Sequence, residues 1–131
     1  MSDRVRLSVL DTSPIVQGAT ARQALHNTLD LARLADELGF HRYWVPEHHG
    51  MSGVASAAPA VLVARIAAER LSLNLIPEGA PLATPRQGQV PRQALMVRTL
   101  VHGHADRRRS CELLSELDLP VREARRPDFP R

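Results

Sequence analysis

The stretch His41-Arg42-Tyr43-Trp44-Val45-Pro46-Glu47-His48-His49-Gly50 decides how this chain is interpreted, because a short apolar run leads directly into titratable side chains. The apolar run, 43–45, consists of residues that favour β-strands. Pro46 cannot donate a hydrogen bond to a neighbouring strand, so the strand is expected to end there. Residues 47–49 then lie on the loop beyond the carboxyl end of the strand, where α/β proteins bind ligands. The motif alone fits a solvated loop with two histidines equally well.

A strand and a helix are predicted before this motif. Residues 5–10 alternate polar and apolar side chains, which is typical of a strand. A helix is predicted over 21–38, with Thr20 as its N-cap, Gln23 completing a capping box and Gly39 ending it. The strand at 41–46 follows directly, and the connection is long enough for a right-handed parallel crossover.

The pattern continues after the motif with a helix at 57–69, in which Pro59 occupies an early position, and a strand at 71–76. Residues 77–93 contain four prolines and two glycines, and their apolar residues follow neither the helical nor the strand spacing, which indicates an irregular junction. A further strand is predicted over 94–101. The repeating order of strand and helix predicts an α/β fold with a parallel sheet.

The final helix is predicted over 107–117, with Asp106 as its cap. Its predicted apolar face consists of Leu113, Leu114 and Leu117. The tail from Pro120 onward contains too few apolar residues to fold by itself.

Composition narrows the range of functions. The chain has 131 residues, of which 44% are hydrophobic and 24% charged, a balance typical of one globular domain. No segment approaches the eighteen apolar residues of a membrane helix, and the first residues do not form a signal peptide, so a cytoplasmic protein without membrane contact is expected. All seventeen basic residues are arginine, and only 3% of the residues are aromatic, which leaves few stacking platforms and argues against nucleic-acid binding. Cys111 is the single cysteine and excludes an intrachain disulfide.

Three segments closely resemble the amino-terminal part of the bacterial luciferase-like flavin-dependent monooxygenases. They are Leu7–Pro14 with Ala24–Thr28, then His41–His49, then Ala55–Leu62. A later segment, Leu95–Arg107 with Ser110, Glu112, Leu113 and Leu114, resembles the last strand and helix of the same family. The resemblance implies an eight-stranded β/α barrel from which the middle is deleted, leaving a partial TIM-type barrel with parallel strands in the spatial order 8-1-2-3.

The resemblance also implies a division of the chain. Residues 1–76 would form the first barrel units, 77–93 a junction, 94–119 the last strand and helix, and 120–131 a disordered tail. The strand at 95–101 should therefore pair in parallel with the strand at 5–10.

The resemblance further implies a reduced-flavin site (FMNH2, or a deazaflavin) that acts with O2 on a small-molecule substrate. His48 corresponds to the histidine beside the flavin and is the expected catalytic residue. The expected cofactor-binding residues are Asp11, Glu47, His49 and Ser56. His48 should lie over the carboxyl edge of the sheet, within reach of Asp11 or of the loop at His102.

The missing strands predict that this chain is inactive by itself, because a catalytic site depends on its surrounding residues for precise placement. Two alternatives remain open. The chain is a non-catalytic interaction protein that forms a homo-oligomer through its exposed strand edges, or four histidines, His48, His49, His102 and His104, bind zinc.

Overall fold

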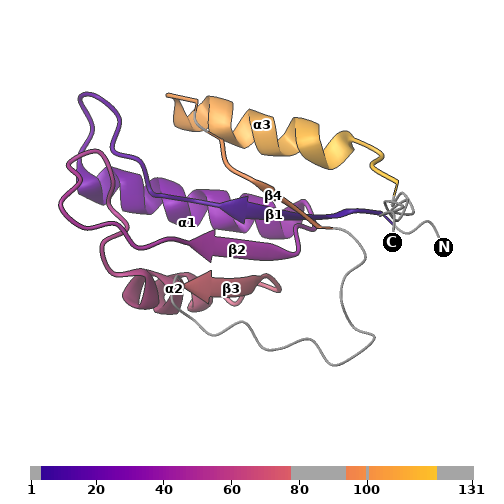
Figure 1. The fold of residues 1–131 in the computed structure, drawn as a ribbon, viewed down its shortest axis with the longest axis horizontal. Coiled ribbons are helices and arrows are strands. Elements are labelled where there is room, and N and C mark those ends of the chain that lie inside the picture. The colour runs from indigo at the N-terminus through magenta and orange to yellow at the C-terminus, as the bar shows by residue number, and fades with distance from the viewer. Residues whose placement is uncertain (1–3, 78–93, 100, 121–131) are drawn as a thin grey trace, which may run out of the picture.

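The computed structural model describes residues 4–77, 94–99 and 101–120. The elements in chain order are β1 (Arg6–Leu10), α1 (Ala21–Glu37), β2 (Arg42–Val45), α2 (Pro59–Ala67), β3 (Asn74–Pro77), β4 (Ala94–Val97) and α3 (His104–Glu116) (Figure 1). Nearly all of the predicted junction and tail lies outside these residues. No helix within the described part is long and apolar enough to cross a lipid bilayer.

The four strands form one parallel sheet in the order β3-β2-β1-β4. β4 pairs with β1 over four positions, from Arg6 opposite Ala94 to Val9 opposite Val97. This confirms the predicted parallel pairing and the strand order of a partial β/α barrel. β4 is shorter than the predicted strand over 94–101. β1 ends at Leu10, one position beyond the last pair, so it offers β4 at most one further residue with which to pair.

The hydrophobic core lies between the sheet and its helices. Val9, Tyr43 and Val45 are buried on one face of the sheet and pack with residues of α1 and α2 such as Leu31 and Ile66. Because neighbouring residues of a strand point to opposite faces, the half-buried Trp44 points to the other face. That second face corresponds to the inside of a barrel.

Thr20 and Gly39 are confirmed as the residues that end α1. The backbone N–H of Gln23 donates to Thr20 Oγ1 at 3.2 Å. At the other end Gly39 has a φ of +75°, its N–H donates to Asp36, and the N–H of the buried Phe40 donates to Ala35. This pattern is a Schellman motif, which explains why glycine ends the helix.

The amino end of α3 differs from the prediction. The helix begins at His104 after the N-cap Gly103, so Asp106 is the third helical residue and not the cap. A Cβ atom at position 103 would lie 2.9 Å from Asp106 Oδ2, so glycine leaves room for that carboxylate. A carboxylate in the first turn is stabilised by the helix dipole, which accounts for its place there.

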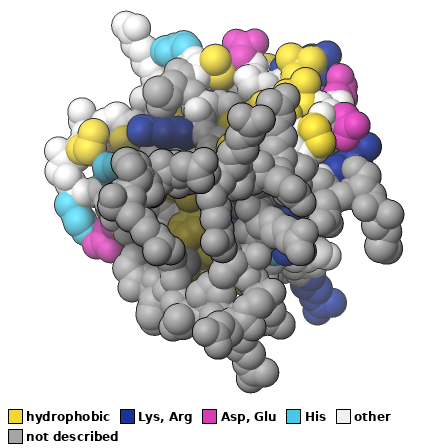
Figure 2. All heavy atoms as spheres, turned by 45° about the vertical axis from the view of Figure 1, so that its right-hand side comes forward, with side chains coloured by type: hydrophobic (Ala, Val, Ile, Leu, Met, Phe, Trp, Pro, Cys, Tyr) yellow, Lys and Arg dark blue, Asp and Glu magenta, His cyan; other side chains and the backbone are white. Residues whose placement is uncertain are grey.

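The buried face of α3 also differs from the prediction. The helix buries Arg107 and Cys111, whereas Leu113 and Leu117 are 47% and 51% exposed. Arg107 is paired with Asp11 on the loop after β1, and this pairing turns the 107/111 side of the helix toward the core. Figure 2 shows exposed hydrophobic side chains among arginine and acidic side chains at its upper right. The leucine spacing predicted the element correctly but not the direction that it faces.

Candidate functional site

The loops after β1 and β2 lie together at the carboxyl edge of the sheet. The N–H of Ile15 donates to the carbonyl of Gly53, and the N–H of Ala55 donates to the carbonyl of Ser13, both at 2.9 Å. An antiparallel bridge joins Pro14 to Val54 between these bonds. The two loops therefore form a single backbone layer, although they are separate in the sequence.

His48 and Ser56 face each other within this layer. The N–H of His48 donates to the carbonyl of Ser56 at 3.0 Å. The side-chain atoms His48 Nδ1 and Ser56 Oγ are buried and have no hydrogen-bond partner among the described residues. Buried polar atoms without partners are rare in folded proteins, and each calls for a water molecule or a ligand.

The placement of His48 agrees with part of its prediction. The side chain is half-buried and does not belong to the hydrophobic core beneath α2. Among the residues that the structure describes, His48 makes no hydrogen bond to Asp11 or to His102.

Glu47 and His49 lie at the outer rim of the layer. His49 Nε2 and Glu47 Oε1 form a short hydrogen bond. The side chain of His49 is 68% exposed, and that of Glu47 is 44% exposed. Both residues can contact a molecule bound at the rim.

Asp11 lies beneath the layer and not on its surface. Its carboxylate is fully buried, where it accepts hydrogen bonds from Tyr43 Oη at 2.6 Å and Thr28 Oγ1 at 2.7 Å. The N–H of Ser13 donates to it at 2.9 Å and Arg107 Nη2 at 2.5 Å. With four donors inside the protein, the carboxylate holds the loop after β1 in place and is not presented to a ligand at the edge.

Tyr43 acts as a hydrogen-bond donor in this network. Burial raises the pKa of Tyr43 well above its usual value, and the nearby charge of Asp11 raises it further. The phenol therefore keeps its proton at any physiological pH. The turn sequence after β1 is a signal for the Ser13 contact, because aspartate commonly accepts from the backbone two residues on. No sequence signal identifies Thr28, Tyr43 or Arg107 as hydrogen-bond partners of Asp11.

The four histidines of the zinc hypothesis do not converge. His104 Nε2 bonds to Asp30 Oδ2 at 2.7 Å, and Arg108 Nη1 bonds to the same oxygen at 2.6 Å. His49 is paired with Glu47 on a different loop. Within residues 4–77, 94–99 and 101–120, no group of three or more metal-ligating side chains comes together.

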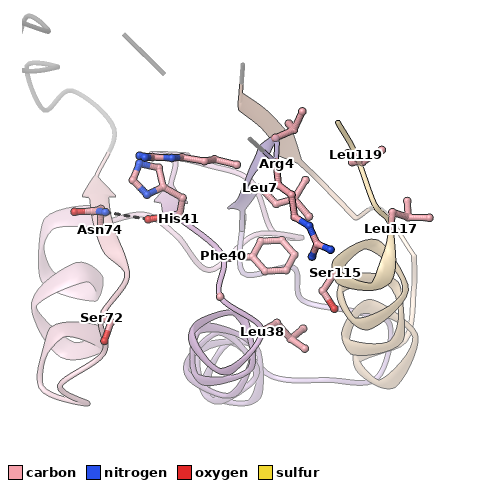
Figure 3. A pocket seen from close by; sticks show the side chains of 13 residues that line it. Arg4, Leu7, Leu38, Phe40, His41, Ser72, Asn74, Ser115, Leu117 and Leu119 are labelled. Atoms are coloured by element: carbon pink, nitrogen blue, oxygen red, sulfur yellow. Dashed lines mark hydrogen bonds between the residues drawn. The ribbon is translucent and has the colours of Figure 1, made fainter. Parts of the chain in front are cut away.

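A cavity of about 370 Å³ lies at the opposite edge of the sheet, where the strands begin (Figure 3). Arg4, Phe40 and His41 are among its lining residues, and Asn74 Nδ2 donates to the carbonyl of His41 at 3.0 Å. The carboxyl ends of α1 and α3 border it, and Arg4 Nε in its wall pairs with Asp118 Oδ1 at 3.3 Å. The amino edge of a parallel β/α fold generally contributes stability, which makes the carboxyl edge the stronger candidate.

Comparisons with known proteins agree with this geometry. A family model described as luciferase-like monooxygenase matches residues 5–104. A luciferase-like monooxygenase of Escherichia coli (strain K12) is 42% identical over 107 residues, which cover 81% of this chain and 32% of that protein. The N-acetyl-S-alkylcysteine monooxygenase of Bacillus subtilis (strain 168) is 38% identical over 102 residues, covering 78% of this chain and 30% of that protein.

A solved structure is also similar to part of this chain. The crystal structure of apo-MsnO8 is 46% identical to the matched part, with a TM-score of 0.53, and the match covers 54% of this chain and 21% of that one. The chain spans about a third of the length of the two curated relatives named above.

Proposed function

The chain belongs to the luciferase-like monooxygenase family, and on that basis we propose that its two carboxyl-edge loops form one wall of a reduced-flavin site. The observation that carries the proposal is the pair of buried atoms without partners, His48 Nδ1 and Ser56 Oγ, on residues joined by a backbone hydrogen bond. An aromatic ring system with both donor and acceptor atoms on its edge can satisfy both. The isoalloxazine ring of FMN, or the ring of a deazaflavin, has such an edge, so these residues fit the cofactor.

Each residue has a distinct part in this proposal. Reduced flavin, when bound, supplies the electrons for reaction with O2. The imidazole of His48 can donate or accept a proton at Nδ1, which suits it to hold a proton beside the reacting centre. Ser56 Oγ would orient the ring, and the exposed Glu47 and His49 would hold it from the rim. Asp11 acts indirectly, since it holds Ser13, whose carbonyl fixes the loop that carries Ser56.

Binding and turnover have different requirements. Oxygen chemistry at a reduced flavin needs walls that exclude water from the reacting atoms. In the described residues one edge of β3 and one edge of β4 are unpaired, so the sheet is open on both sides. We infer that the chain by itself binds flavin weakly and does not turn over.

The experiment is a titration of the purified chain with FMN, followed by flavin fluorescence, for the wild type, His48→Ala and Ser56→Ala. His26→Ala is the matched control, because His26 is an exposed histidine on α1. Each site variant should weaken binding about tenfold, which is the effect of one or two hydrogen bonds. Equal affinity in His48→Ala and His26→Ala would refute the site.

Oxygen consumption with reduced FMN tests the second part of the proposal. We expect the same rate with and without protein. A protein-dependent rate that His48→Ala abolishes would show that the open sheet retains catalysis.

A second candidate function is self-association, which the exposure of β4 favours. Leu95 and Met96 on this edge strand are 49% and 51% exposed. Unpaired strand edges with exposed apolar side chains readily pair with another chain. Sedimentation velocity should show a dimer that Met96→Lys dissociates, whereas Leu113→Lys on α3, a change of equal chemistry at 47% exposure, should not. A monomer in the wild type would exclude this candidate.

A further inference from the structure

A cavity of about 340 Å³ lies at the carboxyl edge, between the loop after β1 and the amino end of α3. This volume is at the lower end of the range of small-molecule sites, about 300–1,000 Å³. Its wall carries the side-chain amides of Gln23 and Asn27 and the basic side chains of His102, His104 and Arg107. The loop that carries His48 and Ser56 is not part of this wall.

Arg107 contributes a buried donor to the wall. The residue is only 3% exposed, and its Nη2 donates to Asp11. Its Nε is also buried but has no partner in the described part of the chain. A guanidinium nitrogen can only donate, so Nε requires an acceptor.

His104 contributes a second buried nitrogen. Its Nε2 is bonded to the carboxylate of Asp30, and because a carboxylate only accepts, Nε2 carries a proton. The other ring nitrogen, Nδ1, is buried and has no partner among residues 4–77, 94–99 and 101–120. Nδ1 accepts a hydrogen bond when the ring is neutral and donates one when the ring is protonated.

The surroundings of the cavity favour a negative charge. α3 begins at His104, and Ala19 in the wall directly precedes the N-cap Thr20 of α1, so the positive ends of two helix dipoles point toward it. The acids nearby are already occupied, since Asp11 is paired with Arg107 and Asp30 with His104 and Arg108. The remaining acid, Asp106, is exposed on the first turn of α3.

We propose that this cavity binds a phosphoryl group, with Arg107 Nε donating to one phosphate oxygen and His104 Nδ1 bonded to a second. At neutral pH inorganic phosphate carries both unprotonated oxygens and an O–H, so it satisfies Nδ1 in either protonation state of the ring. A carboxylate or sulfate has no proton to offer at that pH. A phosphate monoester such as FMN offers the same unprotonated oxygens, but its second pKa of about 6 leaves it mostly without an O–H at neutral pH, so it bonds to Nδ1 of the protonated ring.

The test is a calorimetric titration of the full chain with inorganic phosphate, for the wild type and two variants. His104→Gln keeps an amide donor for Asp30 but removes the ring nitrogen Nδ1. His26→Gln makes the same change at an exposed position on α1 and is the control. We expect His104→Gln to weaken phosphate binding at least about tenfold, the effect of one charge-assisted hydrogen bond, and His26→Gln to leave it unchanged. Equal affinity in the two variants, or no saturable binding to the wild type, would overturn the proposal.

Nuclear magnetic resonance of the wild type provides evidence that does not depend on a variant. The ring signals of His104 should shift saturably with phosphate while those of His26 do not move. Unchanged His104 signals at saturating phosphate would also overturn the proposal.

Competition identifies the source of the phosphoryl group. If FMN displaces phosphate and riboflavin does not, the site takes the phosphate of the cofactor; if neither displaces it, the site takes free phosphate or another ester. Both results support the site. Because the phosphate titration needs no flavin, its failure leaves the proposed flavin site intact, and the loss of flavin binding leaves this inference intact.

Discussion

Arg107 Nη2 on α3 donates to Asp11 Oδ1 after β1 at 2.5 Å, and this contact joins residues 96 positions apart. Both side chains are almost completely buried, with 4% and 0% exposed. The pair attaches α3 to the first strand and, through Ser13, fixes the backbone layer that carries His48 and Ser56. A single buried ion pair therefore couples the last helix to both candidate sites.

Arg107→Met should lower the free energy of unfolding by about 3–5 kcal/mol, because it leaves the Asp11 carboxylate buried without its cation. Urea denaturation followed by circular dichroism measures the change. Arg109→Met on the same helix is the control, since Arg109 is 57% exposed and pairs with Glu112 on the surface. The control should lose no more than about 1 kcal/mol. Similar losses in both variants would mean that the buried pair contributes little.

Gly39→Ala should destabilise the protein by roughly 1–2 kcal/mol, the usual penalty for a left-handed backbone at a residue with a Cβ. The cost comes from the φ of +75° and not from crowding, because an added Cβ meets no atom within 4 Å. Gly53→Ala is the control, because an added Cβ at Gly53 also meets no atom within 4 Å, whereas the φ of Gly53 is not positive. Thermal unfolding should show a lower Tm for Gly39→Ala alone.

Acid should loosen the contact between α1 and α3. Burial alone would raise the pKa of Asp30, but hydrogen bonds from His104 and Arg108 outweigh it and hold that pKa below its usual value. A carboxylate with a lowered pKa adds stability at pH values above its unfolded pKa, and this stability is lost as the pH falls through the folded pKa.

Asp30→Asn should therefore lose less stability than the wild type between pH 5 and about pH 3. Urea denaturation at a series of pH values measures this difference. Asp118→Asn removes a carboxylate that is 72% exposed and should keep the wild-type pH dependence. If the stability of Asp30→Asn depends on pH as that of the wild type does, the acid sensitivity does not come from Asp30.

Arg6→Gln should raise the pKa of His41. Burial lowers that pKa, and the charges of Arg6 and Arg42 lower it further, so the removal of one charge relieves part of the effect. Because the folded pKa is lowered, the unfolded chain takes up the proton more readily, and His41 reduces stability as the pH falls through the unfolded value. Titration of the ring signals by magnetic resonance measures the shift. Arg22→Gln, on the exposed start of α1, should leave the pKa of His41 unchanged.

Local sequence chemistry was sufficient for most of the fold. Alternation in 5–10 and helical spacing in 21–38 predicted β1 and α1 to within a residue at each end, and Thr20 and Gly39 predicted both caps. The family resemblance predicted the pairing of β4 with β1. These features depend on neighbours in the chain or on an inherited topology, so a single sequence contains them.

The tertiary structure alone decided which side chains the sites use. Asp11 follows a strand at the carboxyl edge, as a ligand-binding residue would, but Tyr43, Thr28 and Arg107 bury its carboxylate. The leucines of α3 were predicted to face the core, yet Arg107 and Cys111 occupy that face. The physical reason is that a buried charge must be paired, and the position of its partner, distant in the sequence, sets the rotation of the whole helix.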